Sequence, residues 1–490
     1  MLPSDPKAPW PPRTAQNAAY GRYGAWYEGD PTRLAAAYAG FGPSSTPETG
    51  RRRWMFWAKR DRDPDTRIRL HVPVAADLAT ASADLLFAEP PTIKTPDNDT
   101  TQERLDEVLA DAGLANTLLE GGELAAAFGG VYLRVCWDSD AADHPWIDCL
   151  PADRAVPEWA YGRLKAVTFW QVVAEDGDDV WRHLERHEPG RIEHGLYRGT
   201  RDQLGRLQPL TDSAVTAGLA PNIDADEGNA VLTGVPNLTA VYVPNMRPNR
   251  ADRLSPVGRS DYDGIEGVMD ALDETWTSWM RDIRLGRARI IVPNELLRTA
   301  GKGSGAAFDA DQEVFVPLPG AAPGDVDLVQ NQFAIRVAEH RDTAVALLER
   351  IVSTAGYSAR TFGLDDGSQA TATEVNASER RSLITRAKKV RYWTPGIAAA
   401  VEALLAIDRA VFGANVVPQR PVVEFPDAVE ENPLTVAQTM QALRHAEAAS
   451  TDTLVRLGHP QWGDDQVDAE VARILAESGR SVADPSGFPV

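Results

Sequence analysis

Residues 183–187 (His-Leu-Glu-Arg-His), with His194 nearby, form the only cluster in the sequence whose residue types resemble a zinc site. A zinc-protease helix places Glu directly after its first His, whereas Glu185 stands two residues after His183, so that motif is not matched. On a strand, alternate side chains share a face, and His183, Glu185 and His187 could then bind a metal for hydrolysis. The interpretation that we favour is that they are surface residues of a strand, with no metal and no cofactor.

Other catalytic signatures are missing from the sequence. It contains no Gly-x-x-x-x-Gly-Lys-[Ser/Thr] loop, so the chain is not expected to hydrolyse ATP through such a loop. Residues 301–305 (Gly-Lys-Gly-Ser-Gly) do not have the Gly-x-Ser-x-Gly spacing of a hydrolase nucleophile. A metal-dependent hydrolase therefore depends on residues 183–187 alone, and we expect the protein not to be an enzyme, with no catalytic residues.

Two long amphipathic helices are predicted around a short β-rich insert. The first, from Pro256, repeats apolar residues at spacings of three and four, with Ser260 as a candidate N-cap. The second begins near Phe333, and Gly356 is well placed to end it. A third helix begins at Thr371 and runs past Lys389, with a kink or interruption expected at Pro395.

The remaining pattern indicates an α+β protein. Helical periodicity and glycine or proline punctuation predict helices at 31–39, 73–87, 102–109, 115–127 and 432–479. Alternating apolar and β-branched residues predict strands at 131–137, 146–150, 166–173, 180–187, 191–197, 240–243, 290–293, 314–317 and 422–425. The polar stretch 199–234 is expected to form loops.

Composition limits the possible partners and compartments. The chain has 490 residues, with 50 Lys and Arg against 71 Asp and Glu, a formal net charge of −21. A surface this acidic will not bind nucleic acid generally, so any contact with DNA must be local. The only cysteines are Cys136 and Cys149, which flank a predicted hairpin and could approach one another. Two cysteines in 490 residues do not make a disulfide scaffold, so a reducing compartment is favoured. No signal peptide or membrane span is expected, since the apolar stretch 397–407 is short and contains Glu402.

The order and spacing of five segments resemble the portal proteins of tailed bacteriophages, in the siphophage group also called minor capsid proteins. The segments are residues 85–90 (Leu-Leu-Phe-Ala-Glu-Pro), 258–262 (Gly-Arg-Ser-Asp-Tyr), 287–293 (Arg-Ala-Arg-Ile-Ile-Val-Pro), 356–363 (Gly-Tyr-Ser-Ala-Arg-Thr-Phe-Gly) and 370–375 (Ala-Thr-Ala-Thr-Glu-Val). None is diagnostic alone. Together they extend over most of residues 20–425.

The resemblance implies a ring, usually of twelve subunits, at one capsid vertex, through which double-stranded DNA is packaged and ejected. It implies a virion protein that assembles in the host cytoplasm. Its partners would be the terminase large subunit, head-completion or adaptor proteins, and the major capsid and scaffolding proteins, with no membrane. The implied fold has a mixed α/β wing, a two-helix stem, a small α/β clip and a helical crown. The implied divisions are wing 1–254, stem helix 255–286, clip 287–332, stem helix 333–356, tunnel loop 357–370, wing helix and closing strand 371–431, and crown 432–490.

Carried onto this sequence, the resemblance also implies three sets of site residues. The tunnel loop would approach DNA through Arg360, Thr361, Gly363, Asp365, Asp366 and Gln369. The first stem helix would line the channel with Asp263, Glu266, Asp270, Asp273 and Glu274. The clip would contact terminase through Arg298 and Lys302. Because duplex DNA carries a charge about every 1.7 Å of axis, an acidic bore would let it slide rather than hold it.

Two basic groups allow different interpretations. The helix after Thr371 carries six cations that could face DNA or, as we favour, pair with acidic residues of neighbouring subunits; they are Arg380, Arg381, Arg386, Lys388, Lys389 and Arg391. Residues 51–57 (Arg-Arg-Arg-Trp-Met-Phe-Trp) could suggest base stacking. A wing core or subunit contact is the better interpretation, because duplex DNA hides its base faces.

Overall fold

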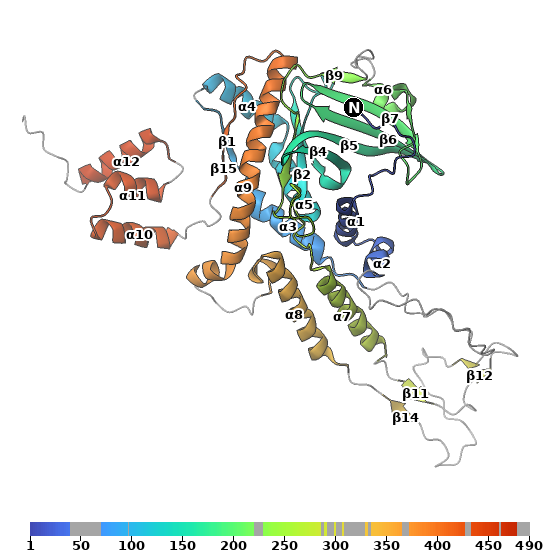
Figure 1. Ribbon diagram of the computed structural model, residues 1–490. Coiled ribbons are helices and arrows are strands. Elements are labelled where there is room, and N and C mark those ends of the chain that lie inside the picture. The colour runs from blue at the N-terminus through green and yellow to red at the C-terminus, as the bar shows by residue number, and fades with distance from the viewer. Residues whose placement is uncertain are drawn as a thin grey trace, which may run out of the picture. The chain divides into compact units, whose positions relative to one another are not determined.

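The computed structural model describes residues 1–39, 70–96, 98–219, 229–285, 289–291, 298–299, 306–307, 329–331, 335–364, 372–426, 433–459 and 462–477. The chain forms two compact units, one of residues 1–368 and 378–425, the other of residues 369–377 and 426–490. The fold is α+β, with antiparallel sheets and helices packed against them (Figure 1).

The N-terminal part of the first unit is helical. Its helices are α1 (Ala15–Glu28), α2 (Pro31–Ala39), α3 (Val74–Phe87), α4 (Asp99–Asp111) and α5 (Leu114–Phe128). The four predicted helical ranges are confirmed to within a few residues. Gly129 ends α5 at a φ of +81°, and a Cβ there would lie 2.8 Å from the Arg259 backbone, so the position requires glycine.

A three-stranded antiparallel sheet follows α5. Its order is β10 (Ala240–Pro244), β2 (Gly130–Cys136) and β3 (Trp146–Pro151), which confirms the predicted hairpin. Cys136 lies opposite Trp146 and Cys149 opposite Leu133, so the two thiols are out of register with each other and both are free.

A larger sheet forms the second β layer. Its order is β4 (Ala155–Ala160), β5 (Arg163–Asp176), β6 (Asp179–Glu188), β7 (Arg191–Gly199) and β8 (Arg206–Gln208), with β9 (Ala230–Leu232) also paired to β7. The three predicted strands at 166–173, 180–187 and 191–197 are confirmed. The prediction of loops throughout 199–234 is wrong in part, because this stretch includes β8, β9 and the short α6 (Ala214–Ala217).

The two long helices are α7 (Glu266–Leu285) and α8 (Val337–Ala355), which pack against each other (Figure 1). The first begins ten residues later than predicted. The preceding residues form turns and an isolated β-bridge between Met246 and Arg259 instead. Gly356 ends α8 at a φ of +101°, as predicted.

Short strands are described in the insert between these helices. They are β11 (Arg289–Ile291), paired with β14 (Val329–Asn331), and β12 (Arg298–Thr299), paired with β13 (Ala306–Ala307). The strand predicted near Ile290 is confirmed. The one predicted at 314–317 lies outside the described residues.

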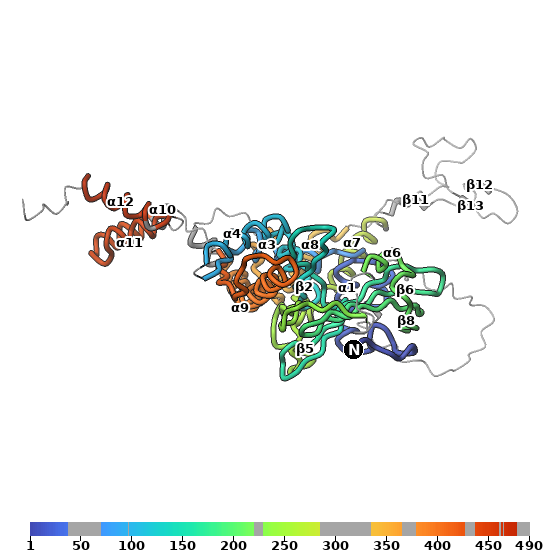
Figure 2. Tube along the Cα trace, turned by 90° about the horizontal axis from the view of Figure 1, so that it is seen from above, coloured from blue at the N-terminus to red at the C-terminus, as the bar shows by residue number. Residues whose placement is uncertain are grey.

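Helix α9 (Ala372–Val411) extends, from residue 378 onward, along the helical layer of the first unit (Figures 1 and 2). It continues through Pro395, so the possible interruption there is not found. Trp393 packs edge-on against Phe87 of α3, with ring centroids 4.7 Å apart. After α9 the chain forms β15 (Val422–Glu424), which pairs with β1 (Thr92–Lys94).

The described residues of the second unit beyond residue 432 form three helices. Its helices are α10 (Pro433–His445), α11 (Thr451–Gly458) and α12 (Asp464–Glu477), which pack consecutively. Leu454, Val455 and Val467 are its buried apolar residues among those described. None of the described helices in either unit has the length and apolar content needed to cross a bilayer.

Candidate functional site

The α7–α8 pair is held together near the insert by a polar and aromatic cluster. Asp282 of α7 accepts hydrogen bonds from His340 Nε2 at 2.9 Å and from Arg336 at 3.0 Å. The bond from His340, followed by that from Arg336, lowers the pKa of Asp282. Trp279 stacks on His340 with an interplanar angle of 8°. These contacts fix the two helices beside each other at the end nearest the insert.

Two of the five carboxylates expected to line a channel are buried within the subunit. Asp273 is 1% exposed and accepts bonds from Val72 N at 2.8 Å and His71 Nδ1 at 2.9 Å. Glu266 is 4% exposed and caps the backbone N–H of Gly264. Burial raises the pKa of Glu266. Neither side chain can line a channel, and the prediction for these two residues is corrected.

The other three stand at different positions on and before α7. Asp263 precedes the helix and accepts a hydrogen bond from Tyr23 OH at 2.8 Å. Asp270 is half-buried, and Glu274 is exposed. Of the five, Glu274 alone is exposed.

The junction above the helix pair holds a buried polar cluster that we call the junction cluster: Ser82, Asp261, Tyr357 and Lys389. Lys389 Nζ lies 2.6 Å from Asp261 Oδ2, 2.5 Å from Ser82 Oγ and 3.0 Å from Tyr357 OH. Tyr357 OH donates to the same Asp261 oxygen at 2.6 Å. Lys389 and Tyr357 are each 1% exposed.

The junction cluster joins four segments that are distant in sequence. Ser82 is on α3, Asp261 precedes α7, Tyr357 follows α8, and Lys389 is on α9. Asn245 Nδ2 satisfies the second Asp261 oxygen at 2.8 Å. Burial lowers the pKa of Lys389, and the neighbouring Asp261 opposes that shift. Burial raises the pKa of Tyr357. A buried ion pair with this many hydrogen bonds fixes the relative positions of the segments that carry it.

The first residues of the predicted tunnel loop are packed rather than free. Arg360–Phe362 form a short 3-10 helix, η5, which Gly363 ends at a φ of +68°. Thr361 Oγ1 lies 2.8 Å from Ser382 Oγ of α9. Arg360 is half-buried and, with Arg381, lines a pocket of about 420 Å³ at the base of the loop. The other loop candidates, Asp365, Asp366 and Gln369, lie outside the described residues.

The basic residues of α9 divide into two groups. Arg381 donates to Ser353 Oγ at 2.8 Å, and Arg386 donates to the carbonyl of Leu85 at 2.6 Å, so both bond within the subunit. Lys389 is buried in the junction cluster. The remaining three are exposed: Arg380, Lys388 and Arg391.

Most of the predicted clip residues and the aromatic residues of 51–57 fall outside the part of the chain that the structure describes. Arg298 lies in β12 opposite Ala307, while Lys302 and residues 51–57 lie outside the described residues. The clip contacts therefore stay predictions.

The histidines of β6 are buried, so their interpretation as surface residues is wrong. His183 Nε2 lies 3.1 Å from His194 Nδ1 of β7, and the two rings are stacked. Burial lowers the pKa of His194 to about 4. His187 bonds Thr239 Oγ1 and Glu185 Oε1, each at 2.7 Å.

Glu185 also receives a hydrogen bond from Arg134 at 2.8 Å. Burial tends to raise the pKa of Glu185, but Arg134 and His187 outweigh burial and lower it. His183, Glu185 and His187 do share one face, as alternation predicts, and their polar atoms bond one another and their neighbours. Among the described residues, no group of three or more His, Cys, Asp and Glu side chains is arranged to hold a metal.

Sequence reasoning missed the junction cluster. Its signal was present in α9, where Ser382, Thr385, Lys389, Trp393 and Ile397 recur at spacings of three and four and are all buried. A lysine in register with the buried Trp393 and Ile397 on one face of a helix indicates a buried partner. Nothing in the sequence identified Asp261 as the partner.

Comparison with known proteins gives one family match. The family model described as "Phage portal protein, SPP1 Gp6-like" matches residues 25–483. No curated protein matches the sequence. Similar solved chains come from the virion of a native gene transfer agent (GTA) particle, with 14% identity, a TM-score of 0.40, and coverage of 92% of this chain and 95% of that chain.

Two further similar chains come from GTA necks. The neck of an empty GTA particle, computed with C6 symmetry, has 14% identity, a TM-score of 0.42, and coverage of 79% of this chain and 90% of that chain. The neck of a native GTA particle, computed with C12 symmetry, has 14% identity, a TM-score of 0.39, and coverage of 89% and 97%.

Proposed function

The chain belongs to the SPP1 Gp6-like family of phage portal proteins, and on that premise we propose that its copies close into a ring around a channel for double-stranded DNA. The family match over residues 25–483 carries this proposal. The ring would occupy one capsid vertex and would have twelve subunits, the usual number in the family. Double-stranded DNA would be packaged and ejected through it. Its role is structural rather than catalytic.

The α7–α8 pair is the proposed stem, and residues 287–332 between the helices are the proposed clip. Residues 1–254 and 371–431 form the proposed wing, and residues 432–490 the crown. The packing of α7 on α8, tied by Asp282 to Arg336 and His340, supports a two-helix stem. In this arrangement the clip docks the terminase large subunit and later head-completion proteins.

The channel surface is proposed to carry charged residues of both helices and no net positive charge. The exposed carboxylates are Glu274 on α7 and Glu339, Asp342 and Glu349 on α8. The arginines exposed on the same helices are Arg281, Arg284, Arg341 and Arg350. Carboxylates repel the phosphates of a duplex, so DNA passes without being held. The proposal keeps the electrostatic principle of the sequence analysis but replaces Glu266 and Asp273.

The junction cluster is proposed to anchor the tunnel loop. Tyr357, the first residue of the loop, is bonded to Asp261 before the stem and to Lys389 on the wing helix. The base of the loop is thereby fixed to both stem and wing. Arg360 and Arg381, which line the pocket at this base, are the residues proposed to touch phosphates.

Imaging of the purified protein tests the ring. Negative-stain micrographs and mass photometry should show annular particles of many subunits with a central hole that admits a duplex. Particles of single-copy mass at every protein concentration and ionic strength would overturn the proposal.

A charge reversal tests the channel surface. Rings carrying Glu274→Lys with Glu349→Lys should retain duplex DNA at low salt, and release it as salt screens the new charges. Asp138→Lys is the matched control, because Asp138 is exposed in the β2–β3 turn, away from α7 and α8. Equal DNA retention by both variants would show that α7 and α8 do not face the duplex.

A further inference from the structure

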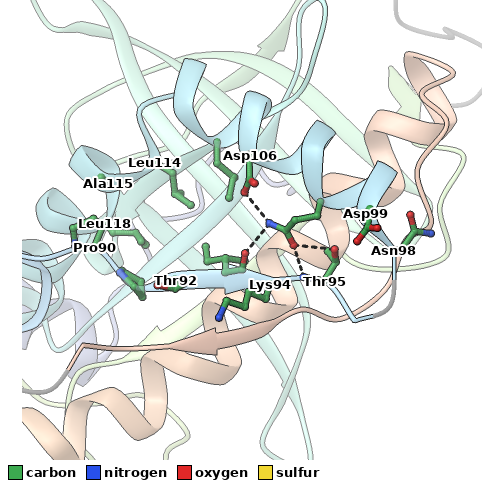
Figure 3. A pocket seen from close by; sticks show the side chains of 14 residues that line it. Pro90, Thr92, Lys94, Thr95, Asn98, Asp99, Asp106, Leu114, Ala115 and Leu118 are labelled. Carbon is green, nitrogen blue, oxygen red and sulfur yellow. Dashed lines mark hydrogen bonds between the residues drawn. The ribbon is translucent and has the colours of Figure 1, made fainter. Parts of the chain in front are cut away.

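A pocket of about 600 Å³ lies between β1, α4 and the start of α5 (Figure 3). Its floor is apolar and includes Ile93, Leu114 and Leu118. Its rim carries polar side chains of α4, including Asp99 and Asp106. The pocket is far in sequence from the proposed stem, clip and tunnel loop.

Strand β1 pairs with β15 along one edge, and α4 lies along its other edge (Figure 3). A single side chain, that of Gln102, covers the backbone groups there. Gln102 Nε2 donates to the carbonyl of Ile93 at 3.0 Å, and Gln102 Oε1 accepts from the N–H of Thr95 at 2.6 Å. The carbonyl of Ile93 and the N–H of Thr95 are the two groups that one residue of a parallel partner strand would bond.

The Gln102 carboxamide therefore takes the place of a strand at this edge. It is also held by Asp106 Oδ1 at 2.7 Å and by Thr95 Oγ1 at 2.9 Å. Sheet edges are sites of strand addition, and proteins protect them when no partner is bound. A side chain that mimics the missing strand is a protection that a real strand can displace.

The surroundings of the edge indicate the chemistry of that strand. Leu109, which is half-buried, and Ala115, which is exposed, offer an apolar surface to alternate side chains of an extended peptide, above the buried Leu114 and Leu118. Asp99 and Asp106 favour cations on the same peptide. Lys94 is the basic residue among those that line the pocket, and its Nζ lies 3.7 Å from Glu424 Oε2, so its charge is partly offset. Charge complementarity thus favours a basic segment over an acidic one.

We propose that this pocket binds an extended, basic peptide segment of a partner protein, which adds to β1 as a parallel strand and displaces Gln102. Main-chain bonds to Ile93 and Thr95 supply binding, and the apolar floor with the two carboxylates supplies selection. This inference does not rest on the proposed DNA channel.

Fluorescence anisotropy with the full-length protein tests the site. The probe is a labelled seven-residue peptide of alternating lysine and valine, and its comparison peptide has proline for the central valine. The alternating peptide should bind, and the proline peptide should bind at least tenfold more weakly because it lacks a needed N–H. Gln102→Ala should tighten binding about tenfold, since the peptide no longer replaces existing hydrogen bonds.

A plug variant separates the pocket from the rest of the surface. Ala115 is exposed and lines the pocket, so Ala115→Trp should abolish binding without altering the core. Asn116→Trp is the matched control, because Asn116 is exposed next to it but does not line the pocket, and it should bind like the wild type.

Three outcomes would overturn the proposal. One is equal binding of the proline and alternating peptides, and another is unchanged binding by Ala115→Trp. The third is absence of peptide binding by both wild type and Gln102→Ala. Self-association of Gln102→Ala without peptide binding belongs to the third outcome and would assign the edge to a second copy of the chain.

Discussion

Replacement of Lys389 by methionine tests whether the junction cluster holds the first unit together. The change removes the ammonium but keeps most of the side-chain volume. Asp261 would then be a buried carboxylate with Tyr357 OH and Asn245 Nδ2 as its remaining side-chain partners. Removing one partner of a buried ion pair destabilises a protein by about 3–5 kcal/mol. We expect a loss in that range.

Urea unfolding measures the loss, with Lys388→Met as the matched control. Lys388 is the preceding residue on α9 and is exposed, so its replacement should change the free energy of unfolding by less than about 0.5 kcal/mol. The double variant Asp261→Asn with Lys389→Met removes both charges and should lose less than Lys389→Met alone, because no unpaired charge stays buried.

The comparison of single and double variants gives the critical result. A loss below about 1 kcal/mol for Lys389→Met would mean that water reaches the cluster and replaces the ammonium. A double variant no more stable than the single one would mean that the loss comes from packing rather than from an unpaired carboxylate. Either result refutes the assignment of Lys389 as an electrostatic anchor.

Three further predictions concern the loop, the clip and the histidines. Deletion of residues 363–369 should leave ring assembly intact but impair DNA packaging or retention, and unaffected packaging in an in vitro assay would remove the loop from the mechanism. Charge reversal at Arg298 and Lys302 should weaken binding of terminase to the ring, and an unchanged affinity by surface plasmon resonance would make both residues bystanders. Burial lowers the pKa of His194 to about 4 from 6.5. Between pH 6.5 and pH 4 the unfolded chain therefore binds a proton at His194 that the folded chain does not, and the free energy of unfolding should fall by up to about 3 kcal/mol over this range. The His194→Asn variant lacks this proton site, so an equal dependence of the urea midpoint on pH in the variant and the wild type would contradict the prediction.

Local patterns predicted most of the regular elements of the first unit. The β2–β3 hairpin and the strands β5, β6 and β7 are short runs rich in β-branched and aromatic residues between clear turn signals, so they are readable from short windows. Helix α5 ends where a glycine must adopt a left-handed conformation. These features depend on neighbours in sequence, which is why sequence reasoning could find them.

The start of α7 could not be read in this way. Residues 256–265 include acidic residues that favour a helix N-terminus, but they also include Gly258 and Gly264, the latter at a φ of +82°. In addition, Asn245 Nδ2 bonds the carbonyl of Arg259, and Asp261 N bonds the carbonyl of Ala126. Such contacts with segments over ten residues away outweigh a helix propensity of a few tenths of a kcal/mol per residue. The role of Gln102 could not be predicted for the same reason, because its hydrogen-bond partners depend on where β1 packs against α4.

The carboxylates of the proposed first stem helix show how burial changes an electrostatic argument built on residue counts. The sequence gives each carboxylate of the first helix equal weight, but Glu266 and Asp273 are inside the subunit and satisfy backbone N–H groups. Their charge reaches a duplex only through protein, while that of Glu274 reaches it through water. In the proposed channel, repulsion of DNA would then come from the exposed carboxylates of both helices and would be offset by the arginines exposed beside them. Salt screens exposed charges more strongly than buried ones, so the sliding of DNA should be more sensitive to ionic strength than a count of all the carboxylates implies.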